Sequence, residues 1–261
     1  MNKRALVLIL ISICPLLLIT RESIGQKDKE IIVSAAISLT NAFEEIGKNF
    51  QGKHKNVRFL GNFGGSGALA RQIIGGAPVD VFASASPKDM DDLDQMNMIL
   101  KDTRINFAGN KIVLVVPVNA AFQLTSFHDL KRAEIKRIAI GNPKTVPAGR
   151  YAEEVLRHFS LAEALKDKLI FAENVRQVLD YVARGEVDAG MVYSTDAPIK
   201  AERVKIAIEA SEQSHKPVVY PIAVIKGSKK EILGKEFISF VVSQEGKQIM
   251  KKYGFKPLER P

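Results

Sequence analysis

Four short stretches of the sequence combine hydroxyl or amide side chains with glycine or proline where a strand is expected to end and a helix to begin. They lie over residues 35–41, 62–68, 142–150 and 173–175. Serine hydroxyls and free backbone N–H groups at a helix start bind anions, because the first turn has unpaired donors and a partial positive charge. A single stretch of this kind is explained better by helix capping, which favours the same residue types. Four of them in one chain favour a site for an anion.

The glycines over 64–67 also require comparison with two motifs of enzymes. A relaxed dinucleotide-binding pattern lies over 65–70, but it needs an acidic residue at the end of the next strand, about 20 positions later. That strand end contains only serine and alanine, over 84–86. The Gly-x-Ser-x-Gly motif of a nucleophilic serine fails at Ala68. We therefore expect no enzyme, and an exported serine hydrolase that uses Ser66 is the less favoured alternative.

The remaining reactive residues indicate neither a metal centre nor a cofactor. The four histidines have no paired H-x-x-x-H spacing and stand in polar or helical contexts typical of a surface, so they suggest neither a zinc site nor a catalytic base. Asp80 and Asp188 are far apart in the chain and each precedes a predicted strand, so we interpret them as structural hydrogen-bond acceptors. We expect a small ligand and no cofactor.

The first 25 residues have the composition of a secretory signal peptide. A positively charged start is followed by a mostly apolar run over 5–19 and by small residues over 23–25, before the expected cleavage site. The run is short for a membrane span, which needs about 20 apolar residues, and it contains Pro15. Cys14 lies in the middle of the run, which disfavours a lipoprotein signal. We expect an exported protein that loses residues 1–25 and, with them, its only cysteine.

The net positive charge of the chain is spread along the sequence and does not indicate a nucleic-acid partner. The formal net charge is +9, of which the leader carries +2, so residues 26–261 carry +7. Lysine and arginine are spread along the chain in short pairs, whereas nucleic-acid-binding surfaces cluster them with exposed aromatic residues. Hydrophobic residues make up 46% and charged residues 26%, which excludes a disordered chain. We expect a globular protein that does not bind nucleic acid.

The elements that must position the four stretches alternate between strand and helix from residue 30 onward. β-branched runs predict strands over 31–36, 57–63, 79–83, 111–116, 137–140, 169–172, 187–193 and 218–225. Apolar residues at helical spacing follow most of them, and one long helix is predicted over about 230–253. This alternation predicts an α/β fold with parallel sheets covered by helices. Ligands of such sheets bind at the carboxyl ends of the strands, where the donor-rich stretches lie.

The same stretches, in this order, resemble the periplasmic molybdate-binding proteins of ABC importers. The resemblance covers about residue 30 to Tyr253 and includes the C-terminal Lys252-Tyr253-Gly254-Phe255. The other sequence motifs that carry the resemblance are Ala35-Ala36-x-Ser38-Leu39-Thr40, the segment 63–72, Gly76-Ala77-Pro78-x-Asp80-x-Phe82, Gly141-x-Pro143-x-x-Val146-Pro147-Ala148-Gly149-x-Tyr151, Glu173-Asn174-Val175-Arg176 and Val192-Tyr193-x-x-Asp196. Several independent motifs at compatible spacing make this a stronger signal than any single glycine pattern.

The resemblance implies a type II periplasmic binding protein fold, in which two α/β lobes flank a cleft and two crossing strands form the hinge. Lobe I would comprise 30–110 and 222–261, and lobe II would comprise 111–221. The resemblance also implies a soluble periplasmic protein that acts as a monomer and delivers its ligand to an ABC permease in the inner membrane.

The resemblance further implies five residues as ligands of the oxyanion. Ser38 and Ser66 would supply hydroxyls and backbone N–H groups, Ala148 and Val175 backbone N–H groups, and Tyr193 its phenol. These residues would bind the oxygens of molybdate and would not coordinate the metal directly. From its burial preference alone, Tyr193 could equally be a core aromatic residue at a strand end.

A pocket of neutral donors selects among tetrahedral anions. Molybdate and tungstate are fully ionised at neutral pH, whereas hydrogen phosphate keeps a proton that would face other donors. Sulfate is also fully ionised, so only its smaller size can exclude it, and a receptor for another oxyanion such as sulfate is the alternative within this class. The family often has a serine-rich run where this chain has glycine over 64–67, which removes hydroxyls and adds backbone freedom. We expect Ser66→Ala to weaken binding more than Gly65→Ala.

Overall fold

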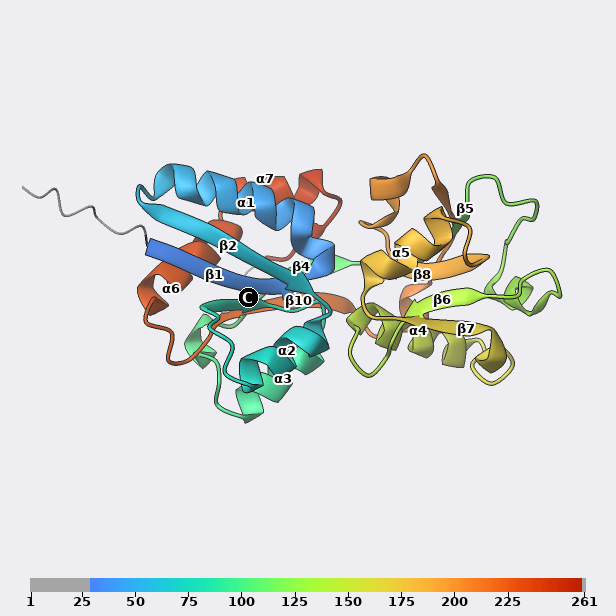
Figure 1. Ribbon diagram of the computed structural model, residues 1–261, viewed down its shortest axis with the longest axis horizontal. Coiled ribbons are helices and arrows are strands. Elements are labelled where there is room, and N and C mark those ends of the chain that lie inside the picture. Colours follow the sequence, from blue (N-terminus) through green and yellow to red (C-terminus); the bar gives the residue numbers. More distant parts are fainter. Residues whose placement is uncertain (1–28, 260–261) are drawn as a thin grey trace, which may run out of the picture.

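The computed structural model describes residues 29–259, which form two sheets with helices on both faces (Figure 1). The predicted signal peptide over 1–25 lies outside the described residues. Within 29–259, no helix is both long enough and apolar enough to cross a membrane.

The first sheet has six strands in the order β11-β4-β10-β3-β1-β2. Its strands are β1 (Lys29–Ala36), β2 (Val57–Gly64), β3 (Val81–Ala83), β4 (Ile105–Asn110), β10 (Val218–Val224) and β11 (Lys256–Pro257). β1 is parallel to β2 and β3, so the carboxyl ends of these three strands lie at one edge. β10 is antiparallel to β3 and β4, and β11 is antiparallel to β4.

Five helices cover the two faces of this sheet. α1 (Thr40–Lys53), α6 (Glu231–Val241) and α7 (Gln244–Lys252) contact one another on one face, and α2 (Ser66–Ile74) and α3 (Pro87–Gln95) lie together on the other (Figure 1). The predicted single helix over 230–253 is wrong, because Ser243 interrupts it. Its Oγ accepts a hydrogen bond from Gly246 N–H at 3.2 Å and caps a new helix, α7.

The second sheet has five strands in the order β7-β6-β8-β5-β9. Its strands are β5 (Ile112–Pro117), β6 (Ile138–Gly141), β7 (Leu169–Ala172), β8 (Ala189–Tyr193) and β9 (Val204–Glu209). β6 is parallel to β7 and β8, while β5 is antiparallel to β8 and β9. α4 (Pro147–His158) and α5 (Val175–Ala183) lie on opposite faces (Figure 1).

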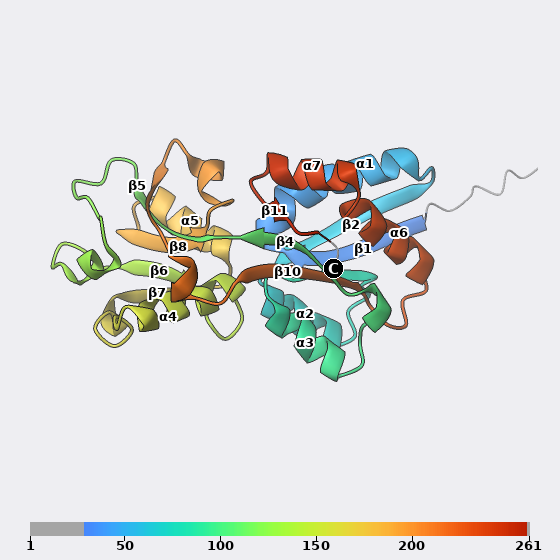
Figure 2. The ribbon, with the colours of Figure 1, turned by 180° about the vertical axis from the view of Figure 1, so that it is seen from behind.

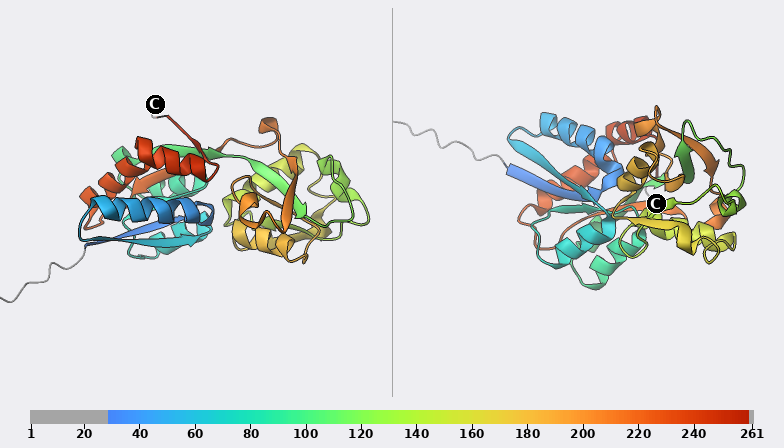
Figure 3. Two further views of the ribbon diagram at one scale, coloured as in Figure 1. Left: turned by 90° about the horizontal axis from the view of Figure 1, so that it is seen from above. Right: turned by 45° about the vertical axis from the view of Figure 1, so that its right-hand side comes forward.

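The chain passes between the two sheets twice. Asn110 ends β4 and Ile112 begins β5, so the first crossing takes one residue. The second crossing joins β9 to β10, and both crossings lie on the same side of the molecule (Figures 2 and 3). The two-lobed α/β fold predicted from the sequence is therefore present, although each sheet is mixed and not purely parallel. Division into lobes at 110/111 and 221/222 stays a prediction; β10 spans the second boundary and pairs only with strands of the first sheet.

Asp80 and Asp188 accept hydrogen bonds near the starts of strands, as predicted. The Asp80 carboxylate accepts the Ile32 backbone N–H at 2.8 Å and the Ser228 hydroxyl at 2.6 Å. The Asp188 carboxylate accepts backbone N–H groups of Lys136 and Arg137 at 2.7 and 2.8 Å. Both carboxylates therefore satisfy backbone donors at the ends of the sheets that lie away from the donor-rich strand ends.

Candidate functional site

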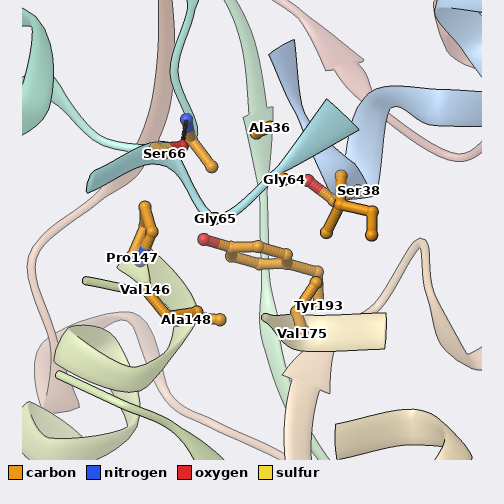
Figure 4. Close-up of a pocket in the computed structure, with 12 residues that line it drawn as sticks. Ala36, Ser38, Gly64, Gly65, Ser66, Val146, Pro147, Ala148, Val175 and Tyr193 are labelled. Carbon is orange, nitrogen blue, oxygen red and sulfur yellow. Dashed lines mark hydrogen bonds between the residues drawn. The ribbon is translucent and has the colours of Figure 1, made fainter. Parts of the chain in front are cut away.

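Four helix starts meet at one cavity between the two sheets (Figure 4). A short 3₁₀ turn, Ile37–Leu39, follows β1, and α2 follows β2. α4 and α5 begin after β6 and β7 of the second sheet. The five predicted ligand residues all line this cavity: Ser38, Ser66, Ala148, Val175 and Tyr193. The parallel strands of each sheet bring these residues together, because their carboxyl ends share one edge.

Helix capping accounts for only part of the donor-rich stretches. Asn174 caps α5 with its side chain, which accepts the Gln177 N–H at 2.9 Å. The residues that precede α2 and α4, Gly65 and Val146, provide no side-chain cap. The first turns of these two helices therefore keep unpaired N–H groups at the cavity.

Three backbone N–H groups of the site have no acceptor within the described part of the chain. Among residues 29–259, no hydrogen bond engages the N–H groups of Ser66, Ala148 or Val175. Each group lies in the first turn of a helix, where the helix itself supplies no acceptor. Aligned helix N-termini also give the cavity a positive potential without a charged side chain.

The two serine hydroxyls are held so that each can donate its proton. Ser66 is fully buried, and its Oγ accepts the Ala85 backbone N–H at 3.0 Å, which leaves the hydroxyl proton free. Ser38 Oγ lies 3.1 Å from the Tyr220 hydroxyl, which also accepts from the Asn110 side chain at 3.2 Å. Because Asn110 donates to it, Tyr220 can direct its own proton at Ser38, which then donates into the cavity.

Tyr193 places a phenol in the cavity from the end of β8. Its side chain is 1% exposed, and its hydroxyl has no hydrogen-bond partner within the described part of the chain. The ring extends toward the glycine loop that contains Gly65, with its hydroxyl at the cavity (Figure 4). Burial raises the pKa of Tyr193 well above 10, so the phenol stays neutral and donates. An unpaired buried hydroxyl costs about 1–3 kcal/mol, and this one is free to donate into the cavity.

Among residues 29–259, no charged side chain lines the cavity. Two buried ion pairs lie close to the site: Arg150 of the second lobe contacts Asp89 of the first at 2.5 Å, and Arg176 contacts Asp196 within the second lobe at 2.6 Å. Burial raises the pKa of Asp89, and the Arg150 guanidinium opposes this shift. The lining therefore offers neutral donors and no carboxylate acceptor, which suits an anion that carries no proton.

The glycine run over 64–67 has a role that the sequence interpretation missed. Gly67 N–H donates to Thr145 O of the second lobe at 3.0 Å, and a Cβ at Gly67 would lie 2.8 Å from that oxygen. A Cβ at Gly65 would lie 3.0 Å from Glu173 O. The glycines thus allow the two lobes to approach closely. Gly65→Ala therefore tests closure and cannot serve as the neutral comparison for Ser66→Ala.

The cavity lining bears on whether the site would hold a metal ion or an oxyanion. Across residues 29–259, no group of three or more His, Cys, Asp or Glu side chains is arranged to hold a metal ion. The cavity instead presents hydroxyl and amide hydrogens, which bind oxygen atoms and do not ligate a cation.

A fold of two α/β units around a cavity lined by helix starts defines the class of solute-binding proteins. The chain belongs to the bacterial extracellular solute-binding protein family, which it matches over residues 31–256. This family binds solutes without catalysis, so the prediction that the chain is not an enzyme is confirmed and the serine hydrolase is excluded.

Individual relatives agree with this assignment over most of their length. The chain is 42% identical over 231 residues to YvgL of Bacillus subtilis, provisionally named a substrate-binding lipoprotein of an ABC transporter, with 88% of each chain covered. It is 39% identical to the molybdate-binding protein ModA of Escherichia coli, covering 87% of this chain and 88% of that one. The solved periplasmic molybdate-binding protein of Azotobacter vinelandii superposes with a TM-score of 0.77 at 25% identity, covering 88% of this chain and all of the other. The resemblance inferred from the sequence motifs is thereby confirmed.

Proposed function

We propose that the protein captures molybdate in the cavity between its lobes and delivers it to an ABC permease. The unpaired hydroxyl of Tyr193, buried among donors from both sheets, is the observation that carries this proposal. Ser38, Ser66, Ala148 and Val175 supply the other donors. Support comes from relatives named as molybdate-binding proteins.

The donor chemistry favours fully ionised oxyanions over hydrogen phosphate. A protonated phosphate oxygen would face hydroxyl or N–H donors, and none of the described residues that line the cavity has a carboxylate to accept its proton. Tungstate has the charge and nearly the size of molybdate, so it binds the same donors. Sulfate is discriminated by size, through contacts that close around the anion.

Binding is coupled to closure of the lobes. Ser38 and Ser66 lie at the first sheet and Ala148, Val175 and Tyr193 at the second, so a bound oxyanion bridges them and stabilises the closed form. The exported protein acts as a monomer in the periplasm, and the permease recognises its closed form. The net positive charge outside the leader raises the rate at which dianions arrive, an effect that salt weakens.

Isothermal titration of the purified protein with molybdate, tungstate, sulfate and phosphate tests the proposal. We expect tight binding of molybdate and tungstate, weaker binding of sulfate and no measurable binding of phosphate. Tight binding of sulfate or phosphate with no heat from molybdate would overturn it. Size-exclusion chromatography with light scattering, with and without molybdate, tests whether the protein is a monomer in solution.

A further inference from the structure

Arg176 stands beside the site without lining it. It occupies the first turn of α5, directly after Val175. Its Nε donates to Asp196 Oδ1 at 2.6 Å, and the Asp196 side chain is fully buried. Asp196 Oδ2 in turn accepts the backbone N–H of Tyr193 at 3.3 Å. The ion pair therefore links two segments of the second lobe that carry proposed ligands.

The other end of the same guanidinium reaches the first lobe. Arg176 Nη2 donates to Asn41 Oδ1 in α1 at 3.1 Å and lies 3.5 Å from Ser38 O. One side chain thus connects the Ser38 turn with the segments of Val175 and Tyr193. Arginine suits this position, because its planar guanidinium presents several donors in different directions at once.

The two halves of this network respond differently to opening of the lobes. The Arg176–Asp196 bond lies within the second lobe, so it survives when the lobes separate. The bonds to Asn41 and the Ser38 carbonyl cross between the lobes, so they exist only when the lobes are together. A bond made only in the closed form shifts the equilibrium toward that form.

We propose that Arg176 is a positioning residue that couples the oxyanion site to lobe closure, held by Asp196 and engaging Asn41 only in the closed protein. This inference rests on the proposed function, because the anion is what favours closure. Arg176 touches no anion itself. It acts by holding the Ser38 turn against the second lobe and by keeping the Tyr193 segment in place through Asp196.

A purely structural role, in which Arg176 only neutralises buried Asp196, makes a different prediction. Under that role Asn41 is irrelevant to binding, and only loss of the arginine has an effect. Arg176→Ala cannot separate the two roles, because it leaves a buried carboxylate unpaired and destabilises the fold. Asn41→Ala separates them, because it removes the interlobe acceptor and leaves the ion pair intact.

The chain offers a matched control on the same helix. Asn49, also in α1, donates from its side chain to Glu245 Oε1 at 3.3 Å, and both residues belong to helices of the first lobe. Asn49→Ala therefore removes one asparagine hydrogen bond that lobe motion does not affect.

The experiment measures Kd and the dissociation rate for whichever of molybdate, tungstate and sulfate the unmodified protein binds most tightly. We expect Asn41→Ala to raise Kd roughly 3- to 10-fold, mainly through faster dissociation, because one hydrogen bond of the closed form is lost while the guanidinium keeps its bond to Asp196. Asn49→Ala should leave Kd within about 2-fold, as distant intralobe changes do. Arg176→Lys should resemble Asn41→Ala, and the double variant should add little further, because both remove one shared contact.

Small-angle X-ray scattering over a titration of the anion supplies a readout that a structural role would not move. Asn41→Ala should need more anion than Asn49→Ala to reach the compact form. Equal Kd and equal compaction for Asn41→Ala and Asn49→Ala would overturn the inference while leaving the proposed function intact. An unmodified protein that binds sulfate but not molybdate would overturn the proposed function and still test the inference. Binding of none of the anions would overturn both.

Discussion

Tyr193→Phe separates the proposed ligand role of this residue from a role in the core. The substitution removes one oxygen and keeps the ring, whose centroid lies 5.8 Å from that of Tyr220. A hydrogen bond to a charged group contributes about 1.5–3 kcal/mol. Loss of this bond should therefore raise the Kd for molybdate roughly 10- to 150-fold.

The same substitution should not destabilise the ligand-free protein. The Tyr193 hydroxyl is buried and makes no hydrogen bond to any residue in 29–259. Removing an unpaired buried hydroxyl relieves a cost of about 1–3 kcal/mol. We expect the free energy of unfolding without ligand to stay the same or to rise, measured by denaturant titration alongside isothermal titration of molybdate.

Tyr220→Phe is the matched comparison. Its hydroxyl bonds to Ser38 Oγ at 3.1 Å and to the Asn110 side chain at 3.2 Å. Its loss should lower the stability of the ligand-free protein by about 1 kcal/mol. If Tyr193→Phe lowered stability in the same way and left Kd unchanged, Tyr193 would be a core residue and the proposed site would be wrong.

Three further outcomes follow from the same geometry. Gly67→Ala should weaken molybdate binding by roughly 10-fold or more, because its Cβ would meet Thr145 O at 2.8 Å in the closed form. Unchanged affinity by isothermal titration would show that the lobes of the bound protein close less tightly than in this structure. Burial raises the pKa of the Tyr193 phenol well above 10, so the affinity for molybdate should not fall between pH 8 and 10 through loss of that proton. Isothermal titrations across this range test the point. A fall in affinity that Tyr193→Phe abolishes would contradict it. Burial raises the pKa of Asp89 above its ordinary value of 3.8, so the native state keeps this proton to higher pH than the unfolded chain does. The contribution of Asp89 to stability should therefore fall as pH rises above about 3.8. Thermal unfolding against pH should show a flatter slope in this window for Asp89→Asn, and an unchanged slope would refute the assignment.

Local sequence patterns predicted the strands that are buried and flanked by helices. β-branched runs identified β1, β6 and β8 within one or two residues, because parallel strands covered by helices on both faces are rich in apolar residues. β4 and β9 were not predicted. β4 reads Ile-Asn-Phe-Ala-Gly-Asn, which has little strand signal, and it is ordered by pairing with β10 and β11. The alternating apolar residues of β9 were a usable signal that the interpretation did not include.

The sequence also predicted that hydrogen-bond donors line the site. Small hydroxyl and amide residues at strand-to-helix junctions indicate anion binding because a helix start always has unpaired N–H groups. The five ligand residues were proposed from motif resemblance, and all five line one cavity. Their role in binding stays a proposal that titration of the variants decides.

Tertiary structure decided which of these groups are free and what surrounds them. The sequence indicated that Tyr193 ends a strand, but only the packing shows that its hydroxyl lacks a partner among the described residues. The approach of Gly67 to Thr145 and the link from Asp196 through Arg176 to Asn41 join segments far apart in the chain. Local patterns specify the donors because helix starts are local, whereas distances across the cleft depend on how two sheets pack, which no local pattern encodes.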